Sequence, residues 1–526
     1  MKKVVLGLAA VAAFPLVAGQ IAWTGGGSTY AWSDGGNWDG GTAPGKGDIA
    51  VIPAGATVGM TQADVNYVVA KDTKLGGIHF AGDDSVLLVT NLTAQTDFNI
   101  PFTGGGECRM LNNNNPYYIK MLADNSSYHG SFMISNSAAY LGCSTGMGTT
   151  NVVTYWGNAT AVKYFGIGSG ISCANEFRLY GTQYLINGGN APTFLGPIRI
   201  WGTTQLATSG TASMSFYGGI TYEGTFTGNY GVSFVGRMFF RGKPVDFGAR
   251  WINGNSAGNF NNGGTWTIDT DVNAAVVAPP SDSSALGPGR IVFERANCLT
   301  PKTGLLLGRA NGDSTSVDLG GYDQRCGELS IGKNGAMNPR CTYITSASDA
   351  TFTILTKGPT QFNGLINDKA SLELNSTNSA TAGSIGLCGT NNTTTGALIA
   401  RRGTINVLPV AVFSNLTAIV ASGDGVIDVQ SAATFAALKT MSVTGRGEVR
   451  MCAGSLNEDM TELEVSGSGK VVLGGGTYRF KSIKIGNTQL FAGDYAVGDA
   501  ALGGAFEGAG DIHVFKGPVG SILIVM

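Results

Sequence analysis

The chain has 526 residues, of which 81 are glycine, 43% are apolar and 13% are charged. Its 33 lysine and arginine residues nearly balance its 35 aspartate and glutamate residues, which excludes the strongly basic surface of a nucleic-acid-binding protein. Disorder is excluded as well, because disordered chains combine low hydrophobicity with high net charge. Abundant glycine among many apolar residues predicts an all-β protein of short strands joined by tight turns.

Residues 1–19 have the pattern of a secretory signal peptide. Lys2 and Lys3 precede an apolar run that ends at Val17, and a small residue follows at Gly19. The run is shorter than the roughly 20 apolar residues that span a bilayer, and no later segment repeats it. We therefore expect a secreted or cell-surface mature chain without a transmembrane segment, cleaved after Gly19 or, alternatively, after Ala22.

Residues 20–58 are predicted to form an N-terminal cap. They contain Trp23, Trp32 and Trp38, and large aromatic side chains can close the open end of a stacked β structure. Strand-like alternation continues through residues 59–300 without a fixed period, which predicts either irregular solenoid coils or a separate β-sandwich.

Looser repeats also occur in that middle region. Segments of the pattern Gly-x-apolar-x-apolar follow one another there at uneven spacings, and they begin at Gly196, Gly218, Gly236 and Gly264.

Residues 301–526 carry the clearest repeat. The same pattern begins at four evenly spaced glycines, Gly403, Gly425, Gly447 and Gly469. Related segments begin at Gly383 and at Gly510, the second close to two periods beyond the last of the four. Such a regular period indicates a β-solenoid with coils of about 22 residues, in which each coil buries its apolar residues by stacking on its neighbours.

This repeat predicts which side chains face the core. The inward residues are expected to be Ile405, Val407, Ile427, Val429, Val449, Val471 and Leu473. Asn406, Asp428 and Arg450 alternate with them and are expected to point outward. Each leading glycine is expected to turn a corner at positive φ. Helical spacing is confined to short stretches such as Ser431–Thr440.

Catalytic motifs are weak. The pattern Gly-x-Ser-x-Gly of a nucleophile elbow occurs at Gly254–Gly258, but no helical segment follows it. The three histidines have no metal-binding spacing and lie at His79, His129 and His513. Glycine–lysine pairs lack the serine or threonine of a phosphate loop and occur at Lys46, Lys243, Lys333 and Lys470. We therefore predict no catalytic residues, no cofactor site and no enzymatic activity.

Acidic turns and cysteines were candidates for metal ligands and disulfides. Three acidic pairs could offer oxygen atoms to calcium: Asp83 with Asp84, Asp269 with Asp271, and Glu458 with Asp459. Such pairs are more often solvated turn residues, so we predict no metal site. The eight cysteines have no Cys-x-x-Cys spacing. Cys326 and Cys341 are the nearest candidates for a disulfide, and the alternative is that most cysteines are small buried side chains.

Aromatic residues are frequent in the middle region. They could stack on sugars along a shallow face or could fill an irregular core, and they include Tyr117, Tyr118, Tyr128, Tyr140, Trp156 and Tyr164.

Two groups of motifs resemble a known family. The segment Phe362-Asn-Gly364-Leu-Ile366, followed by the repeat from Gly403, resembles the autotransporter-associated β-strand repeats of exported bacterial passenger-like proteins. The opening segment with Asn37-Trp38, Pro44 and Asp48-Ile-Ala-Val51 is similar to the entry segment of such proteins. The resemblance implies a right-handed parallel β-helix displayed outside the cell, in adhesive or structural roles, with no catalytic residues to carry over.

The resemblance has one limit. The segment after Gly510 is too short for the membrane β-barrel of a full-length autotransporter, so we do not expect self-translocation.

These patterns favour an exported, non-enzymatic β-solenoid that acts as an adhesin or structural matrix protein, with surface glycans or further copies of itself as partners. Two alternatives stay open. One is a carbohydrate-active β-helix protein, either a polysaccharide lyase or hydrolase with carboxylates from neighbouring coils or a glycan-binding protein. The other is a self-assembling fibre or surface-layer subunit, because stacked coils can pair end to end.

Overall fold

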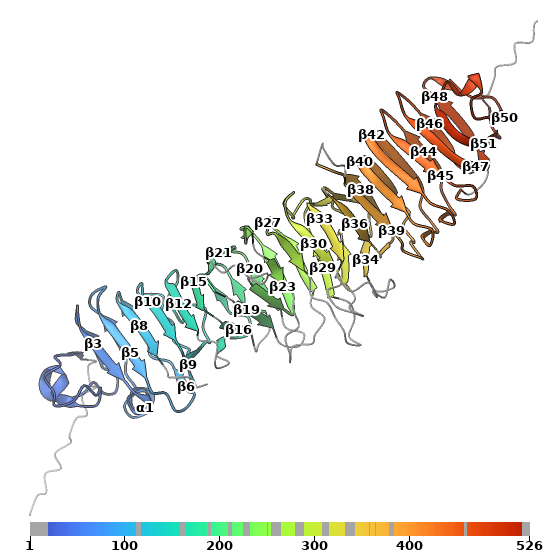
Figure 1. Ribbon diagram of the computed structural model, residues 1–526. Helices are drawn as coiled ribbons and strands as arrows, with labels where there is room; N and C mark the ends of the chain where they lie inside the picture. Colours follow the sequence, from blue (N-terminus) through green and yellow to red (C-terminus); the bar gives the residue numbers. More distant parts are fainter. Residues whose placement is uncertain are drawn as a thin grey trace, which may run out of the picture. The chain divides into compact units, whose positions relative to one another are not determined.

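The protein is an all-β solenoid. The computed structural model describes residues 19–111, 117–157, 164–181, 183–187, 191–202, 204–208, 213–224, 232–249, 251–253, 265–278, 289–307, 315–331, 342–356, 358–362, 364–377, 383–456 and 460–517. Strands make up 51% of this structure and helices 4%, and the stacked parallel coils amount to about 14 turns. The chain forms two compact units, Met1–Arg178 and Leu179–Met526. Within each unit, strands of successive coils lie side by side (Figure 1).

The first unit contains three parallel ladders of strands. One consists of β1 (Gln20–Ala22), β2 (Ile49–Ile52), β4 (Gly77–Phe80) and β7 (Phe102–Gly104). The second consists of β3 (Thr57–Met60), β5 (Val86–Thr90), β8 (Glu107–Leu111), β10 (Ser131–Ser135) and β12 (Val152–Gly157). The third consists of β6 (Thr96–Phe98), β9 (Tyr118–Met121), β11 (Ala138–Leu141) and β13 (Tyr164–Ile167). The short β14 (Ser172–Cys173) and the beginning of β15 (Glu176–Gly181) follow.

The second unit opens with three further parallel ladders. One consists of β18 (Ile198–Ile200), β21 (Ile220–Tyr222), β24 (Val245–Asp246) and β27 (Val272–Asn273). Another consists of β16 (Gln183–Asn187), β19 (Thr204–Thr208), β22 (Val232–Val235), β25 (Trp251–Asn253), β28 (Val276–Ala278), β30 (Gly304–Leu307) and β33 (Glu328–Ile331). The last consists of β17 (Thr193–Phe194), β20 (Ser213–Phe216), β23 (Arg237–Arg241), β26 (Thr265–Asp269), β29 (Gly289–Phe293), β31 (Thr315–Asp318), β34 (Thr342–Thr345) and β37 (Leu365–Ile366).

The remainder of the second unit is built on one large sheet. It consists of β32 (Gln324–Cys326), β35 (Ala350–Ile354), β36 (Pro359–Phe362), β38 (Ala370–Asn375), β39 (Ser384–Leu387), β40 (Ala397–Val407), β42 (Ala418–Val429), β44 (Thr440–Val443), β45 (Glu448–Met451), β46 (Glu462–Val465), β47 (Lys470–Phe480), β48 (Ser482–Ile485), β49 (Thr488–Gln489), β50 (Gly493–Ala496) and β51 (Phe506–Val514). The strands β41 (Val412–Phe413) and β43 (Thr434–Phe435) come from the same part of the chain and form a separate two-stranded ladder.

The regular repeat corresponds to real coils. Ile405 pairs with Ile427, Ile427 with Val449, and Val449 with Val471, each in parallel register. All the predicted inward residues of this repeat are buried, while Asn406, Asp428 and Arg450 are not. Because equivalent apolar residues lie above one another, each coil covers the core of its neighbour. The predicted solenoid and its core residues are confirmed. The handedness stays a prediction.

The leading glycines of the repeat have a different role from the predicted one. Of the four evenly spaced glycines, only Gly403 has a positive φ, at 99°. At Gly425, Gly447 and Gly469, a Cβ atom would lie 2.0, 2.4 and 2.7 Å from a carbonyl oxygen of the preceding coil. Glycine is therefore required there by the close approach of two backbones. The turn at positive φ lies just before these positions, at glycines that stack on one another in successive coils, Gly423, Gly445 and Gly467.

One register prediction was wrong. The segment from Gly510 does not lie two coils beyond Gly469, because Val471 pairs directly with Phe506, so a single long coil separates the strands.

The looser repeats of the middle region pair at equivalent positions within two ladders. Ile198 pairs with Ile220 in one ladder, and Met238 pairs with Trp266 in the other.

The predicted helical stretch Ser431–Thr440 is not a helix. It contains β43 and the first residue of β44. Its buried residues Ala433, Phe435 and Leu438 lie one period after buried Ala411, Phe413 and Leu416, and the rings of Phe413 and Phe435 stack with centroids 5.4 Å apart. Packing between coils therefore overrides the local helical spacing.

The α-helix of the described residues is α1 (Gln62–Val69), which was not predicted from the sequence. Thr61 and Asp64 form a capping box at its N-terminus, and Val65 and Val68 are buried. The Gln62 side-chain oxygen accepts hydrogen bonds from the backbone amides of Thr93 and Ala94, which ties the helix to the segment before β6. Short 3₁₀ helices lie at Gly35–Asn37, Asp39–Gly41 and Ala500–Leu502. Across the described residues, no helix has the length and apolar character to cross a bilayer.

The tryptophans of the predicted cap form one buried cluster. Trp23, Trp32 and Trp38 are each at most 7% exposed, and the ring of Trp38 lies 5.0 Å from that of Trp23 and 4.7 Å from that of Trp32. The indole nitrogen of Trp38 donates to the carbonyl oxygen of Trp32 at 2.7 Å. At the other end, the final strands are covered by antiparallel partners, β48 by β49 and β51 by β50.

The contact at Gly447 predicts a large cost for a single methyl group. Gly447→Ala places a Cβ atom 2.4 Å from the Ala421 carbonyl oxygen, so it should lower the free energy of unfolding by about 1–3 kcal/mol. Gly358→Ala is the matched control, because nothing lies within 4 Å of its Cβ position. Urea unfolding followed by circular dichroism compares the two. Equal stability of both variants would contradict the close-approach explanation.

Candidate functional site

Several motifs considered from the sequence lie outside the described residues. These are the Gly-x-Ser-x-Gly pattern at Gly254–Gly258, Lys333, the pair Glu458 and Asp459, Cys341, and the side chain of Tyr164. What the sequence predicts for each of them therefore stays a prediction.

The three histidines occupy unrelated surroundings. The Nδ1 atom of His79, on β4, lies 3.0 Å from the Thr103 hydroxyl. His129 is exposed before β10, and His513, on β51, contacts the carboxylate of Asp494 on β50. In the part of the chain that the structure describes, no three His, Cys, Asp or Glu side chains gather where one metal ion could bind.

Two shallow grooves bring ionisable side chains together. In the first unit, a groove of about 450 Å³ is lined by Asp83, His129, Ser131 and Asn151. Within the described residues no hydrogen bond links the first three of these, so they do not form the connected relay that activates a serine nucleophile. In the second unit, a groove of about 510 Å³ is lined by Lys302, Glu328, Thr356 and Thr377.

A third groove is smaller. It measures about 290 Å³ and is lined mainly by glycine and serine backbone together with Lys470.

Several charged side chains on the lateral surface form ion pairs between coils. Arg401 binds Glu373 at 2.8 Å, Arg446 binds Asp424 at 2.6 Å, and Lys484 binds Glu464 at 2.9 Å. Further pairs between coils are Arg199 with Glu223, Arg241 with Glu294, Arg290 with Asp318, and Lys481 with Glu462. Each exposed pair contributes only about 0–1 kcal/mol to stability. Their effect is to neutralise the outer surface locally.

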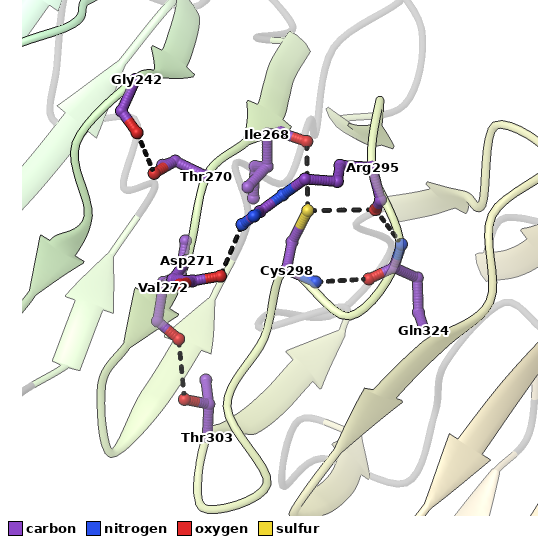
Figure 2. A network of polar contacts seen from close by, with 9 residues as sticks. All are labelled: Gly242, Ile268, Thr270, Asp271, Val272, Arg295, Cys298, Thr303 and Gln324. Atoms are coloured by element: carbon purple, nitrogen blue, oxygen red, sulfur yellow. Dashed lines mark hydrogen bonds and ion pairs between the residues drawn. The ribbon is translucent and has the colours of Figure 1, made fainter.

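One of the acidic pairs considered as calcium ligands contains a residue of such an ion pair. Asp271 binds the Arg295 guanidinium at 2.5 Å (Figure 2), so a cation already neutralises this carboxylate. Asp269 lies on β26 as the register partner of Arg241. The Arg241 guanidinium binds Glu294, so the ion pair that the structure shows for these two acidic residues is that of Asp271.

Arg295 also belongs to a network around a buried thiol. The Cys298 Sγ atom lies 3.1 Å from the Arg295 carbonyl oxygen and 3.5 Å from that of Ile268 (Figure 2). The Cys298 amide donates to the Gln324 side-chain oxygen at 3.0 Å, and the Gln324 side-chain nitrogen donates to the Arg295 carbonyl oxygen at 2.5 Å. Burial raises the pKa of the Cys298 thiol to about 11, and the nearby Arg295 opposes this only in part. The thiol is thus a neutral structural group rather than a nucleophile.

The other described cysteines are also free thiols. Cys108, Cys173 and Cys326 are buried like Cys298, whereas Cys143, Cys388 and Cys452 are half-buried. Most of the described cysteines are therefore small buried side chains.

The predicted aromatic residues separate into core and surface groups. Tyr128 is buried, and its hydroxyl donates to the carbonyl oxygens of Ser131 at 2.8 Å and Gly106 at 3.1 Å. Tyr117 and Trp156 are exposed. Tyr118 and Tyr140 lie on the outer face of adjacent strands, with ring centroids 5.9 Å apart and planes inclined by 23°. We call these two side chains the tyrosine pair.

The groups around the tyrosine pair were not predicted from the sequence. Lys120 lies with its ammonium 5.3 Å from the Tyr140 ring centroid, and the side chain of Gln95 contacts the Tyr118 hydroxyl. Little in the sequence indicated that Tyr118 and Tyr140 would be in contact. The register partner of Tyr118 is Ala138, so the spacing between the two tyrosines differs from the length of the coil. A second outer stack in the other unit, Tyr180 with Trp201 at 4.5 Å, was also missed.

Comparisons with known proteins add no relative: no family model, no curated protein and no solved structure matches this chain. The fold itself defines the class, which is a parallel β-solenoid. The autotransporter-associated nature of its repeats stays a prediction.

The cysteine environments predict selective labelling. At pH 8, iodoacetamide should modify the half-buried Cys143 and Cys452, while Cys108 and Cys298 stay unmodified because burial excludes the reagent and raises the pKa of both thiols. Peptide mapping by mass spectrometry measures the difference. In urea all of these cysteines should react, which controls for peptide detection. Labelling of Cys298 as fast as Cys143 in the folded chain would contradict the described network.

Proposed function

We propose that the protein is an exported, non-enzymatic β-solenoid with an adhesive or structural role at the cell surface. The observation that carries this proposal is the pairing of lateral charges between neighbouring coils. Because these opposite charges are paired, the surface is polar but has no strong local electrostatic potential of one sign.

The charge pairs argue against the enzymatic alternative. Glycoside hydrolysis uses two carboxyl groups that flank the bond to be cleaved, one of which must hold a proton. Such an acid is normally placed in an apolar setting that favours its neutral form. Glu373, Asp424 and Glu464 instead each form an ion pair with an Arg or Lys side chain of another coil.

Export is supported by the position of the first strand. β1 begins at Gln20, directly after the predicted cleavage site, and pairs in parallel with β2. Cleavage after Gly19 keeps β1 whole. Cleavage after Ala22 would remove it and expose the edge of β2.

The covered ends disfavour the fibre alternative. α1 and the tryptophan cluster lie at the beginning of the first unit, and the antiparallel β49 and β50 cover the last strands of the second. Short antiparallel covering strands are a common means of blocking edge-to-edge association.

Export predicts a defined mature chain. When the full chain is produced in a Gram-negative bacterium, fractionation should recover it outside the cytoplasm, and intact-mass analysis should place its N-terminus at Gln20. The control is a chain with Lys2 and Lys3 replaced by Asp, which should stay cytoplasmic and unprocessed. Cytoplasmic accumulation of the unaltered chain at full mass would refute export.

The absence of catalysis is a separate prediction. The purified chain, incubated with neutral and acidic polysaccharides, should release no reducing ends and no unsaturated products. Product release that disappears in Glu328→Gln, at the groove of the second unit, would replace this proposal with the enzymatic one.

A further inference from the structure

We propose that the tyrosine pair is a binding surface for a neutral saccharide chain. This inference rests on the proposed extracellular role, since it supplies the ligand class that an adhesive surface would hold. It is carried by the stacking of the two rings, by a glycine beside one ring, and by the polar groups around them.

The two rings form one continuous aromatic surface. Tyr118 on β9 and Tyr140 on β11 alternate with buried residues, so both project from the outer face of the ladder. Their register partners are Ala138 and Lys120, which places the rings diagonally across two coils. With planes inclined by 23° and centroids 5.9 Å apart, the rings lie roughly parallel and offset.

A glycine lets the second ring lie against the sheet. Tyr140 is the register partner of Gly166 on β13, and a Cβ atom at Gly166 would lie 2.4 Å from Cδ2 of Tyr140. Any larger residue would therefore displace the ring, whose Cδ2 edge faces Gly166. Both rings of the pair are half-buried, so each keeps part of its surface open to solvent.

Polar groups surround this aromatic surface. The Lys120 ammonium lies 5.3 Å from the Tyr140 centroid, and its register partner on β6 is Asp97. Gln95 contacts the Tyr118 hydroxyl, and burial raises the pKa of Tyr118, so its phenol stays a hydrogen-bond donor. Flat rings beside convergent donors and acceptors suit a sugar, which has apolar C–H faces and hydroxyl edges.

The charges favour a neutral sugar over an acidic one. Lys120 and Asp97 contribute opposite charges to the same edge, so the surface has no net attraction for a polyanion. A hydroxyl group can donate to Asp97 and accept from Lys120, whereas a sugar carboxylate would meet repulsion from Asp97.

The test uses the purified mature chain in isothermal titration calorimetry with four neutral probes, cellohexaose, xylohexaose, mannohexaose and maltohexaose. Polygalacturonate, measured at low and high salt, is the acidic comparison. At least one should bind, and Tyr140→Ala, Tyr118→Ala and Gly166→Ala should each weaken binding about tenfold or more. Gly166→Ala is the sharpest variant, because it keeps both rings and displaces only Tyr140. Circular dichroism confirms that each variant is folded.

Matched controls are available in the same chain. Tyr30→Ala and Tyr322→Ala remove exposed tyrosines that are 84% and 43% accessible, and Gly59→Ala adds a methyl group whose nearest neighbour is 3.8 Å away. These three should bind as the unaltered chain does.

Three outcomes overturn the inference: none of the neutral probes binds, binding is unchanged in Tyr140→Ala and Gly166→Ala, or only polygalacturonate binds and salt abolishes it. Failure here leaves the export and polysaccharide-cleavage tests unaffected. Conversely, a cytoplasmic chain that still binds a neutral hexaose would refute the extracellular role and keep the binding surface.

Discussion

The close approach of successive backbones is the constraint on which the rest of the structure depends. Parallel strands of neighbouring coils must come within hydrogen-bonding distance of each other. At Gly425, Gly447 and Gly469, a carbonyl oxygen of the preceding coil occupies the space that a Cβ atom would need. With glycine there, the coils stack and the aliphatic residues beside it lie directly above one another, as Ile427 and Val449 do. The high glycine content is thus a requirement of stacking as well as of turning.

The same stacking organises the outer surface. Parallel register places every outward residue beside an outward residue of the next coil, so side chains meet that are a whole coil apart in sequence. Opposite charges in register form pairs, as Lys484 does with Glu464. Residues that are diagonal neighbours also meet, as Arg401 does with Glu373 in an ion pair and Tyr118 with Tyr140 in a stack. The chemical environment of an outward residue on this solenoid therefore depends on the residues beside it in the neighbouring coils.

The fold was largely predictable because a fixed period identifies equivalent residues without knowledge of the coordinates. Ile405, Ile427 and Val449 were assigned to the core on that basis, and they are buried. Ser431–Thr440 was misread because its Ala, Phe and Leu have helical spacing, whereas the same residue types one period earlier were the better guide. The residues of the tyrosine pair could be named, but not their contact, because the coil length between β9 and β11 was not visible in the sequence.

Coil length varies widely, yet the ladders continue. Tyr118 pairs with Ala138 across a short coil, and Val471 pairs with Phe506 across a much longer one. Turns absorb these differences, since the entropic cost of a longer loop grows only slowly with its length. Register is fixed by the strands, where a slip of one residue would turn every apolar side chain outward. The register of an outward ladder such as the one that holds the tyrosine pair is therefore set by the same energy that buries the core.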